Sequence, residues 1–179
     1  MEFYKSKTYA NLMAAFAGES QARNKYTYYA AEAKNAGFEQ IGRIFQETAD
    51  NEKEHAEIWF KQIHGNSMPS TAEALKDAAD GEWFEFDSMY KGFAADAESE
   101  GYLEIAALFK MVGSIEKEHH DRFVKLLKNI EEGIVFKRDG VKIWKCLNCG
   151  HIHVGESAPN ACPVCKKPQS YFQIKEENY

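Results

Sequence analysis

The tetrapeptide EKEH occupies residues 52–55 and recurs at residues 116–119, which places the two copies 64 residues apart. The same offset pairs other residues around it: Tyr26 with Tyr90, Gly37 with Gly101, Phe38 with Tyr102, Ile41 with Ile105, and Phe45 with Phe109. A charged tetrapeptide can recur by chance in a chain rich in Lys and Glu, but this run of matches cannot. We therefore interpret EKEH as part of an internal structural repeat.

Four long stretches carry apolar residues at helical spacing, over residues 6–36, 38–64, 72–100 and 102–130. Glycines end these stretches, at Gly37, Gly65, Gly101 and Gly133, and Ser70 or Thr71 is placed to cap the third one. At a rise of about 1.5 Å per residue, each helix would be about 40 Å long. The stripes expected to face the core include Ile41, Ile44, Ile105 and Leu108. The pattern predicts an all-α four-helix bundle.

Within each EKEH copy, the first Glu and the His are three residues apart and therefore share one helix face. Glu52 and His55 continue the apolar stripe of the second stretch, and Glu116 and His119 continue that of the fourth. The intervening Lys and Glu point away from this face. His120 falls off the stripe, and we expect it on the surface.

The other two helices also place carboxylates on their inward stripes. Glu19 lies between Phe16 and Tyr26 in the first helix, and Glu82 and Glu85 lie in the third. The repeat is imperfect here, because Glu19 plus 64 gives Trp83 rather than Glu82. One extra residue in this turn, such as a π-bulge, would restore the face, and such bulges favour functional sites.

Five Glu and two His on inward stripes predict a dimetal site. The alternative is that these acids are simply solvated, but all seven would then occupy apolar stripes by accident. Burying ionised carboxylates without compensation costs several kcal/mol each, and a pair of cations supplies that compensation. Carboxylate oxygen with imidazole nitrogen suits iron or manganese. The predicted ligands are Glu19, Glu52, His55, Glu82, Glu85, Glu116 and His119.

The C-terminal part has a different character, and we place the domain boundary between residues 137 and 138. Residues 1–137 would form the bundle, and residues 138–179 a small domain of short extended segments around an Asp139-Gly140 turn. All four cysteines lie there, as Cys146-x2-Cys149 and Cys162-x2-Cys165. Two disulfides are the alternative, but paired C-x-x-C spacing favours a tetrahedral thiolate metal site.

Composition excludes several classes of protein. The formal net charge of −6 and pI near 5.6 argue against nucleic acid as a partner, because binding to its phosphates requires a basic protein face. The sequence contains no apolar run of about 18 residues, so we expect no transmembrane helix. The N-terminus has neither a clean apolar core nor a cleavage site, so we expect no signal peptide and a cytoplasmic location.

These motifs together resemble the rubrerythrin family, in which a ferritin-like diiron four-helix bundle precedes a rubredoxin-like Fe(Cys)4 domain. The resemblance covers essentially the whole chain. It rests on FAGESQARNKY at 16–26, ETADNEKEHA at 47–56, GEWFEFDSMY at 81–90, EKEHHDRF at 116–123, CLNCG at 146–150 and CPVC at 162–165. It implies two non-haem irons and one Fe(Cys)4 iron per chain, with zinc as the competing ion at the cysteines.

The resemblance also implies a role for each site residue. Glu52 and Glu116 would bridge the irons, with Glu19 a terminal ligand of the first iron and Glu82 and His119 ligands of the second. His55 would bind the first iron in the reduced state, and Glu85 would bind it after oxidation. Tyr26 and Tyr90 would hydrogen-bond ligand carboxylates, with simple packing as the alternative.

The activity implied by the resemblance is peroxidase activity, in which hydrogen peroxide is reduced to water with electrons relayed by the Fe(Cys)4 centre. A head-to-tail homodimer or a higher oligomer is expected. The sequence has no Gly-rich dinucleotide motif, so the electron donor would be a separate NAD(P)H-dependent rubredoxin reductase or a rubredoxin. Ferritin-like iron oxidation and storage, and a non-catalytic electron carrier, remain the alternatives.

Overall fold

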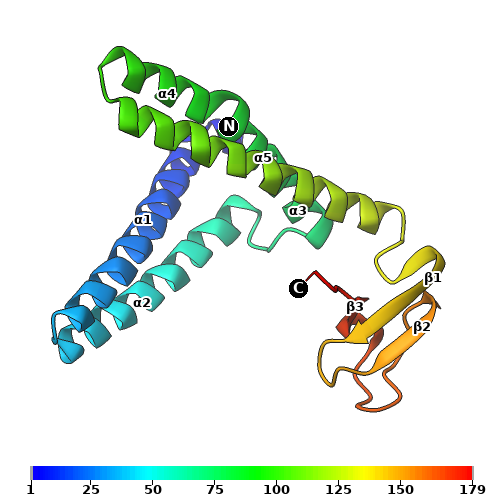
Figure 1. The fold of residues 1–179 in the computed structure, drawn as a ribbon. Helices are drawn as coiled ribbons and strands as arrows, with labels where there is room; N and C mark the ends of the chain where they lie inside the picture. Colours follow the sequence, from blue (N-terminus) through cyan, green and yellow to red (C-terminus); the bar gives the residue numbers. More distant parts are fainter. Residues whose placement is uncertain (1, 179) are drawn as a thin grey trace. The chain divides into compact units, whose positions relative to one another are not determined.

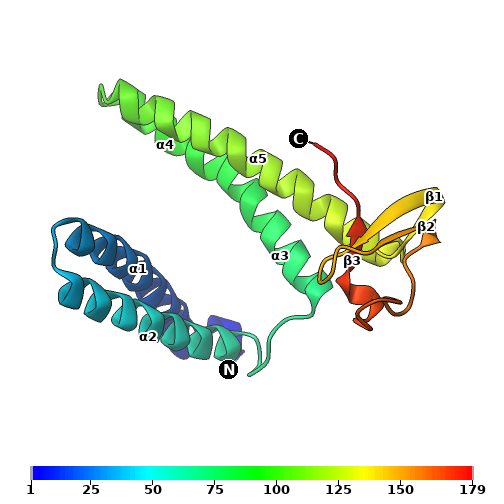
Figure 2. The ribbon, with the colours of Figure 1, turned by 60° about the horizontal axis from the view of Figure 1, so that its bottom comes forward.

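The computed structural model describes residues 2–178, and it contains two compact units that meet in sequence between Pro69 and Ser70. In the first unit, a short 3₁₀ turn over Phe3–Lys5 precedes helices α1 (Lys7–Asn35) and α2 (Glu39–Ile63). These helices lie side by side as an antiparallel hairpin (Figure 1, Figure 2). The turn between them uses Gly37 at φ 84°, a backbone conformation that glycine adopts without strain.

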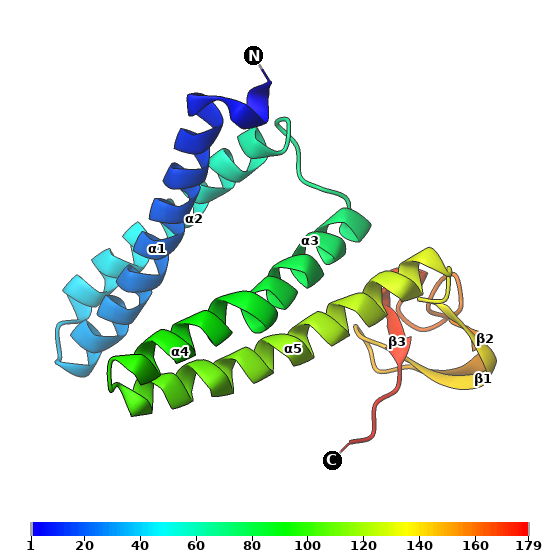
Figure 3. The same ribbon diagram turned by 90° about the horizontal axis from the view of Figure 1, so that it is seen from above.

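The second unit contains a longer hairpin. Helix α3 (Thr71–Phe84) runs through a π-helical turn (Glu85–Met89) into α4 (Tyr90–Ser99), and α5 (Leu103–Glu131) returns alongside both (Figure 3). Gly101 makes the reversal at φ 87°, the counterpart of Gly37 in the first unit. Ser70 caps α3 in a capping box with Glu73, as the sequence indicated.

The seam between the helices of each hairpin is lined by small residues. The buried helix residues include Ala30, Gly42, Ala49, Ala56, Ala94, Ala106 and Gly113. Ile41 and Ile105, predicted to face the core, are 48% and 46% exposed. Small residues let the two helix backbones of a hairpin approach closely, and the placement of Ile41 and Ile105 in the core of a four-helix bundle stays a prediction, because the structure defines each hairpin separately.

A small sheet follows α5 within the second unit. Strand β1 (Lys137–Cys146) is central and pairs antiparallel with β2 (Ile152–Ser157) on one side and β3 (Phe172–Ile174) on the other. A 3₁₀ turn over Gln169–Tyr171 leads into β3. The predicted Asp139-Gly140 turn is instead an irregularity within β1, where the pairing register shifts between Lys137 and Lys142. Gly140 supplies the required φ of 72°.

The core of this sheet is built around the cysteines. Trp144, Cys146, Ala158, Cys162 and Phe172 are buried together. The indole N–H of Trp144 donates to the carbonyl of Gly155 at 3.0 Å, so its one polar group is satisfied. Two of the four thiols are therefore held in a rigid apolar setting. Within residues 2–178, no helix combines the length and apolar character needed to cross a membrane.

Candidate metal centres

The α1–α2 hairpin brings Glu19, Glu52 and His55 together. Their potential ligand atoms all lie within 4.8 Å of one another. His55 Nδ1 is 2.8 Å from an oxygen of Glu52 and 4.0 Å from an oxygen of Glu19. The short distance follows from the spacing of three residues on one helix, which stacks the two side chains on the same face.

The α3–α5 hairpin repeats this arrangement with Glu82, Glu116 and His119, again within 4.8 Å of one another. His119 Nδ1 is 2.8 Å from an oxygen of Glu116, the same distance as in the first hairpin. Glu82 is closer to its histidine than Glu19 is, at 3.5 Å. We call these two sets the first and the second triad.

The donor chemistry of both triads fits a metal ion. Each offers two carboxylates and one imidazole, a set that suits iron or manganese. The side chains of Glu52 and Glu116 are only 17% and 13% exposed, so both carboxylates are largely withdrawn from water. Within each triad, two carboxylates whose oxygens lie within 4.8 Å of one another repel each other, and a cation between them removes that cost. Together the triads supply one Glu from each of two helices and a Glu-x-x-His from each of two others, the ligand set of dimetal carboxylate proteins.

The π-helical turn accounts for the imperfection of the repeat. The N–H of Tyr90 donates to the carbonyl of Glu85, five residues earlier, which is the π-helical pattern. One residue is therefore inserted between Glu82 and Tyr90. Glu82 follows its counterpart Glu19 by 63 residues, whereas Tyr90 follows Tyr26 by 64. The predicted π-bulge is confirmed.

Glu85 is the first residue of this π-helical turn and is half-buried. Among the described residues, the second triad does not include it. Its role as a ligand stays a prediction.

Tyr26 and Tyr90 occupy matching positions and pack in matching ways. Tyr26 contacts Phe45 with ring centroids 6.1 Å apart, and Tyr90 contacts Phe109 at 5.9 Å. Burial raises the pKa of Tyr90, and the nearby carboxylates, led by Glu85, raise it further. The Tyr90 phenol therefore stays protonated at neutral pH and can donate a hydrogen bond. The hydrogen bonds expected from the two tyrosines to ligand carboxylates stay predictions.

The four cysteine sulfurs form a third cluster, with their Sγ atoms within 4.8 Å of one another. Cys146 Sγ is 3.7 Å from Cys165 Sγ, and Cys149 Sγ is 3.6 Å from Cys162 Sγ. A disulfide requires about 2.05 Å, so the thiols are free. Sulfurs around a tetrahedral metal at about 2.3 Å lie about 3.8 Å apart, which is close to the observed spacing.

Backbone geometry prepares this cluster for a cation. Gly150 follows Cys149 at φ 77°, and Lys166 follows Cys165 at φ 63°, so both C-x-x-C loops end in a left-handed turn. The backbone N–H of Lys167 lowers the pKa of Cys165 to about 6. The backbone N–H of His151 also favours the thiolate of Cys149, but burial and the neighbouring thiols outweigh it and raise that pKa to about 12. Four sulfurs this close resist carrying several negative charges without a metal.

Sequence reasoning missed the environment of His120. It was expected on the surface, but it is half-buried, and its Nδ1 lies 2.8 Å from the backbone carbonyl of Ala79 on α3. Its ring also packs against Trp83 with centroids 5.0 Å apart. The repeat itself held a signal, because the matching residue in the first hairpin is the buried Ala56.

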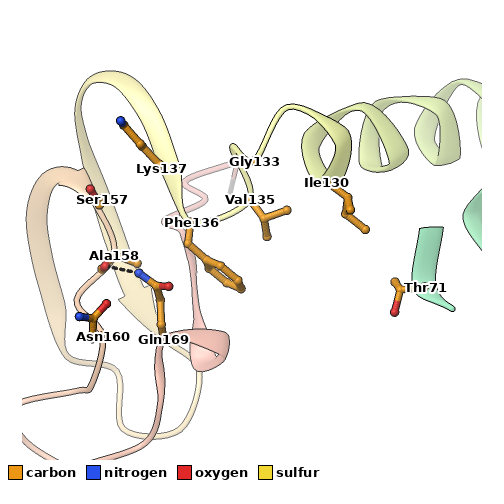
Figure 4. Close-up of a pocket in the computed structure, with 10 residues that line it drawn as sticks. All are labelled: Thr71, Ile130, Gly133, Val135, Phe136, Lys137, Ser157, Ala158, Asn160 and Gln169. Atoms are coloured by element: carbon orange, nitrogen blue, oxygen red, sulfur yellow. Dashed lines mark hydrogen bonds between the residues drawn. The ribbon is translucent and has the colours of Figure 1, made fainter.

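A hollow outside these clusters lies where the ends of α3 and α5 approach the sheet (Figure 4). It has a volume of about 810 Å³ and is lined by residues such as Ile130, Val135, Phe136 and Gln169. Gln169 donates from its side-chain amide to the carbonyl of Ala158 at 2.6 Å. None of the candidate ligands lines this hollow, so it is separate from the metal centres.

Two carboxylate–histidine triads on helical hairpins, followed by a tetrathiolate cluster on a small sheet, define a non-haem metalloprotein with a ferritin-like helical part. The family model for rubrerythrin matches residues 10–127, and that for the rubrerythrin rubredoxin-like domain matches residues 144–173. The chain belongs to the rubrerythrin family, whose members carry a diiron site and an Fe(Cys)4 centre.

Curated relatives match nearly the full chain. Rubrerythrin-1 of Clostridium acetobutylicum is 49% identical over 97% of this chain and 97% of its own length. Rubrerythrin of Clostridium perfringens is 46% identical, again over 97% of both chains. Rubrerythrin of Nitratidesulfovibrio vulgaris is 42% identical with the same coverage.

Proposed function

We propose that this protein is a non-haem diiron peroxidase that reduces hydrogen peroxide to water in defence against oxidative stress. Each triad would hold one iron of the diiron centre, and the four cysteines would hold the iron that relays electrons. The observation that supports this most strongly is the presence, in one chain, of two matched Glu2His triads and a tetrathiolate cluster with metal-like sulfur spacing. An iron-storage protein has no use for the second kind of centre.

When bound, the iron pair would supply the two electrons that, with two protons, convert one hydrogen peroxide molecule into two water molecules. The chain's own residues would hold the metals and control charge. Glu52 and Glu116 are the most buried carboxylates of their triads and are the proposed bridging ligands. Glu19 and Glu82 would be the terminal ligands of the two irons. Each comes from the helix of its hairpin that does not carry the Glu-x-x-His pair.

The histidines and Glu85 would distinguish the two ends of the centre. His119 would bind the second iron, and His55, whose side chain is more exposed at 52% against 35%, would bind the first iron in the reduced state. Glu85 would bind the first iron when its charge increases. Its position at the start of a π-helical turn supports this, since such turns accommodate rearrangement more readily than regular helix.

Tyr90 would act as a hydrogen-bond donor to the ligand carboxylates. Its raised pKa keeps the proton on the phenol, so it can stabilise a carboxylate without itself adding negative charge. Tyr26 would act in the same way in the first hairpin, because it occupies the matching position against Phe45.

The cysteine-bound iron would receive electrons one at a time from a separate NAD(P)H-dependent rubredoxin reductase or a rubredoxin. We expect a homodimer, arranged head to tail, so that the Fe(Cys)4 centre of one chain serves the diiron centre of the other. A reducing cytoplasm fits the four free thiols, since thiols persist in that compartment.

Peroxide-dependent NADH oxidation with an added rubredoxin reductase tests this function, alongside iron analysis. The proposal predicts about three irons per chain, one for each cluster of ligands, and NADH consumption that matches the peroxide supplied. Iron uptake into large cages without peroxide turnover would support storage instead. About three irons per chain, with NADH oxidation that does not depend on peroxide, would support a non-catalytic electron carrier instead.

A further inference from the structure

His120 interrupts a pattern of small residues on the hairpin seams. At intervals of seven residues, α2 places Gly42, Ala49 and Ala56 on its seam, and α5 places Ala106, Gly113 and His120. The first two positions of each series are buried small residues in both helices. At the third position, the buried Ala56 of α2 corresponds to a half-buried imidazole in α5.

The imidazole of His120 ties α5 to α3 on both sides of Glu82. Its Nδ1 is 2.8 Å from the carbonyl of Ala79, and because a carbonyl can only accept, Nδ1 carries the proton and donates it. Its ring packs on Trp83, and Trp83 in turn packs edge-on against Phe86 with centroids 5.5 Å apart. These contacts therefore run from three residues before Glu82 into the π-helical turn.

In the first hairpin, the corresponding carbonyl accepts a hydrogen bond from a different donor. Phe16 precedes Glu19 by three residues, as Ala79 precedes Glu82, and the carbonyl of Phe16 accepts a hydrogen bond from the Ser20 hydroxyl at 2.7 Å. That donor belongs to the same helix, so it does not fix the distance between α1 and α2. In the second hairpin the donor comes from the opposite helix, which does fix that distance.

The second hairpin has a reason to need such a tie. The π-helical turn begins three residues after Glu82. It weakens the regular helix there, because a backbone hydrogen bond in the turn joins residues five apart instead of four apart. Glu82 must nevertheless stay within reach of His119, the neighbour of His120 on α5. The observed distance is 3.5 Å, shorter than the 4.0 Å of the first triad, where no π-helical turn follows the Glu.

We propose that His120 is a positioning residue, whose hydrogen bond to the Ala79 carbonyl holds the turn bearing Glu82 against α5 and thereby orders the second triad for metal binding. It acts through Glu82 and does not itself bind the metal. The inference rests on the metal-binding part of the proposed function and not on peroxide turnover. Partners that orient ligands in this way typically change metal affinity by about 10- to 100-fold when they are removed.

The test is an anaerobic titration of ferrous iron into the metal-free full-length protein, with the electron paramagnetic resonance spectrum of the mixed-valence state as a second readout. His120→Phe keeps a ring against Trp83 and removes the donor, whereas His120→Asn keeps a donor near the Nδ1 position. Ser20→Ala is the matched control, because it removes the extra hydrogen bond from the corresponding carbonyl of the first hairpin.

His120→Phe should weaken one of the two non-cysteine irons on the order of tenfold and change the mixed-valence spectrum, while the cysteine-bound iron is unaffected. His120→Asn should restore affinity and spectrum, and Ser20→Ala should leave both unchanged. Circular dichroism verifies the fold, and His120→Leu, close in size to Asn and without a donor, replaces His120→Phe if that chain unfolds.

Wild-type affinity and spectrum in the donor-free variant would overturn the inference, as would a His120→Asn protein as impaired as His120→Phe. A wild-type protein that binds all its iron tightly but turns over no peroxide would instead overturn the proposed peroxidase function, and the effect of His120 on iron binding would stand.

Discussion

The two hairpins carry the same triad in different surroundings. In both, the histidine Nδ1 lies 2.8 Å from the Glu three residues before it. The first hairpin has an uninterrupted α1 and a seam of small residues, and its histidine is about half exposed. The second has a π-helical turn, the additional carboxylate Glu85 and a cross-helix hydrogen bond from His120.

This difference teaches that the repeat preserves the ligands and varies what surrounds them. The pair of triads supplies the ligands proposed for two metals. A centre that cycles between two oxidation states would benefit from a ligand that can change, and Glu85, at the start of the π-helical turn, is the proposed one. The second hairpin is therefore where we expect redox function to separate from simple metal storage.

The largest effects should come from removing the most buried carboxylate of either triad. Glu52→Ala and Glu116→Ala each delete a direct ligand, and loss of supporting partners alone costs about 10- to 100-fold in metal affinity. Each variant should therefore lose iron by more than that factor, as measured by iron analysis after desalting. If one of the two retained full iron, the triads would not be equivalent halves of the ligand set.

Cys162→Ser should distinguish the role of the cysteine centre from that of the two triads. Cys162 is buried in the sheet core, and its loss removes one of four thiolates. NADH-linked peroxide turnover should disappear, while the chemically reduced triads still react with peroxide in stopped-flow absorbance. Loss of both reactions would show that the cysteine centre does more than relay electrons.

Glu85→Ala should affect turnover more than iron content. The side chain lies outside the second triad, so iron should be retained, while peroxide turnover slows by about 10- to 100-fold. Asp87→Ala is the matched control, because Asp87 lies in the same π-helical turn and pairs on the surface with Lys91 at 2.7 Å. Equal rates in Glu85→Ala and wild type would contradict the role of Glu85 as an exchangeable ligand.

The smallest effects should come from the helix caps. Ser70 caps α3 in a reciprocal box with Glu73, whereas Ser6 caps α1 by accepting from Tyr9. Ser70→Ala should lower the free energy of unfolding by about 1 kcal/mol, and Ser6→Ala by no more than this, in chemical denaturation. A larger loss for Ser6→Ala would mean that the capping box adds little to α3.

Much of this arrangement could be predicted from spacing alone. Apolar periodicity located the long helices, and Gly37 and Gly101 ended them because only glycine adopts their backbone conformation freely. The triads followed from the spacing of Glu and His on one helix face. Even the π-helical turn could be predicted, because Glu82 fell one residue out of register with Glu19.

Other features depend on how closely the helices approach, which periodicity does not specify. Ile41 lies beside Gly42, and a pattern of apolar residues favours the larger side chain for the seam, whereas backbone approach selects the smaller one. The match of His120 to the buried Ala56 could have indicated that His120 is not a surface residue, but the acceptor of its hydrogen bond is a backbone carbonyl, which a sequence pattern does not identify. The sequence predicted a turn at Asp139-Gly140, where the structure has an irregularity within β1. The two are hard to tell apart from sequence, because glycine favours both β-bulges and hairpin turns.

The most direct test of the central claim is an anaerobic titration of the fully reduced, iron-loaded protein with hydrogen peroxide, followed by Mössbauer spectroscopy. Three irons store three electrons, one for each cluster of ligands, and each peroxide accepts two. The account predicts complete oxidation at about 1.5 equivalents of peroxide per chain, and at about 1 equivalent in Cys162→Ser. An endpoint near 0.5 equivalents, with the triad irons still ferrous, would contradict it.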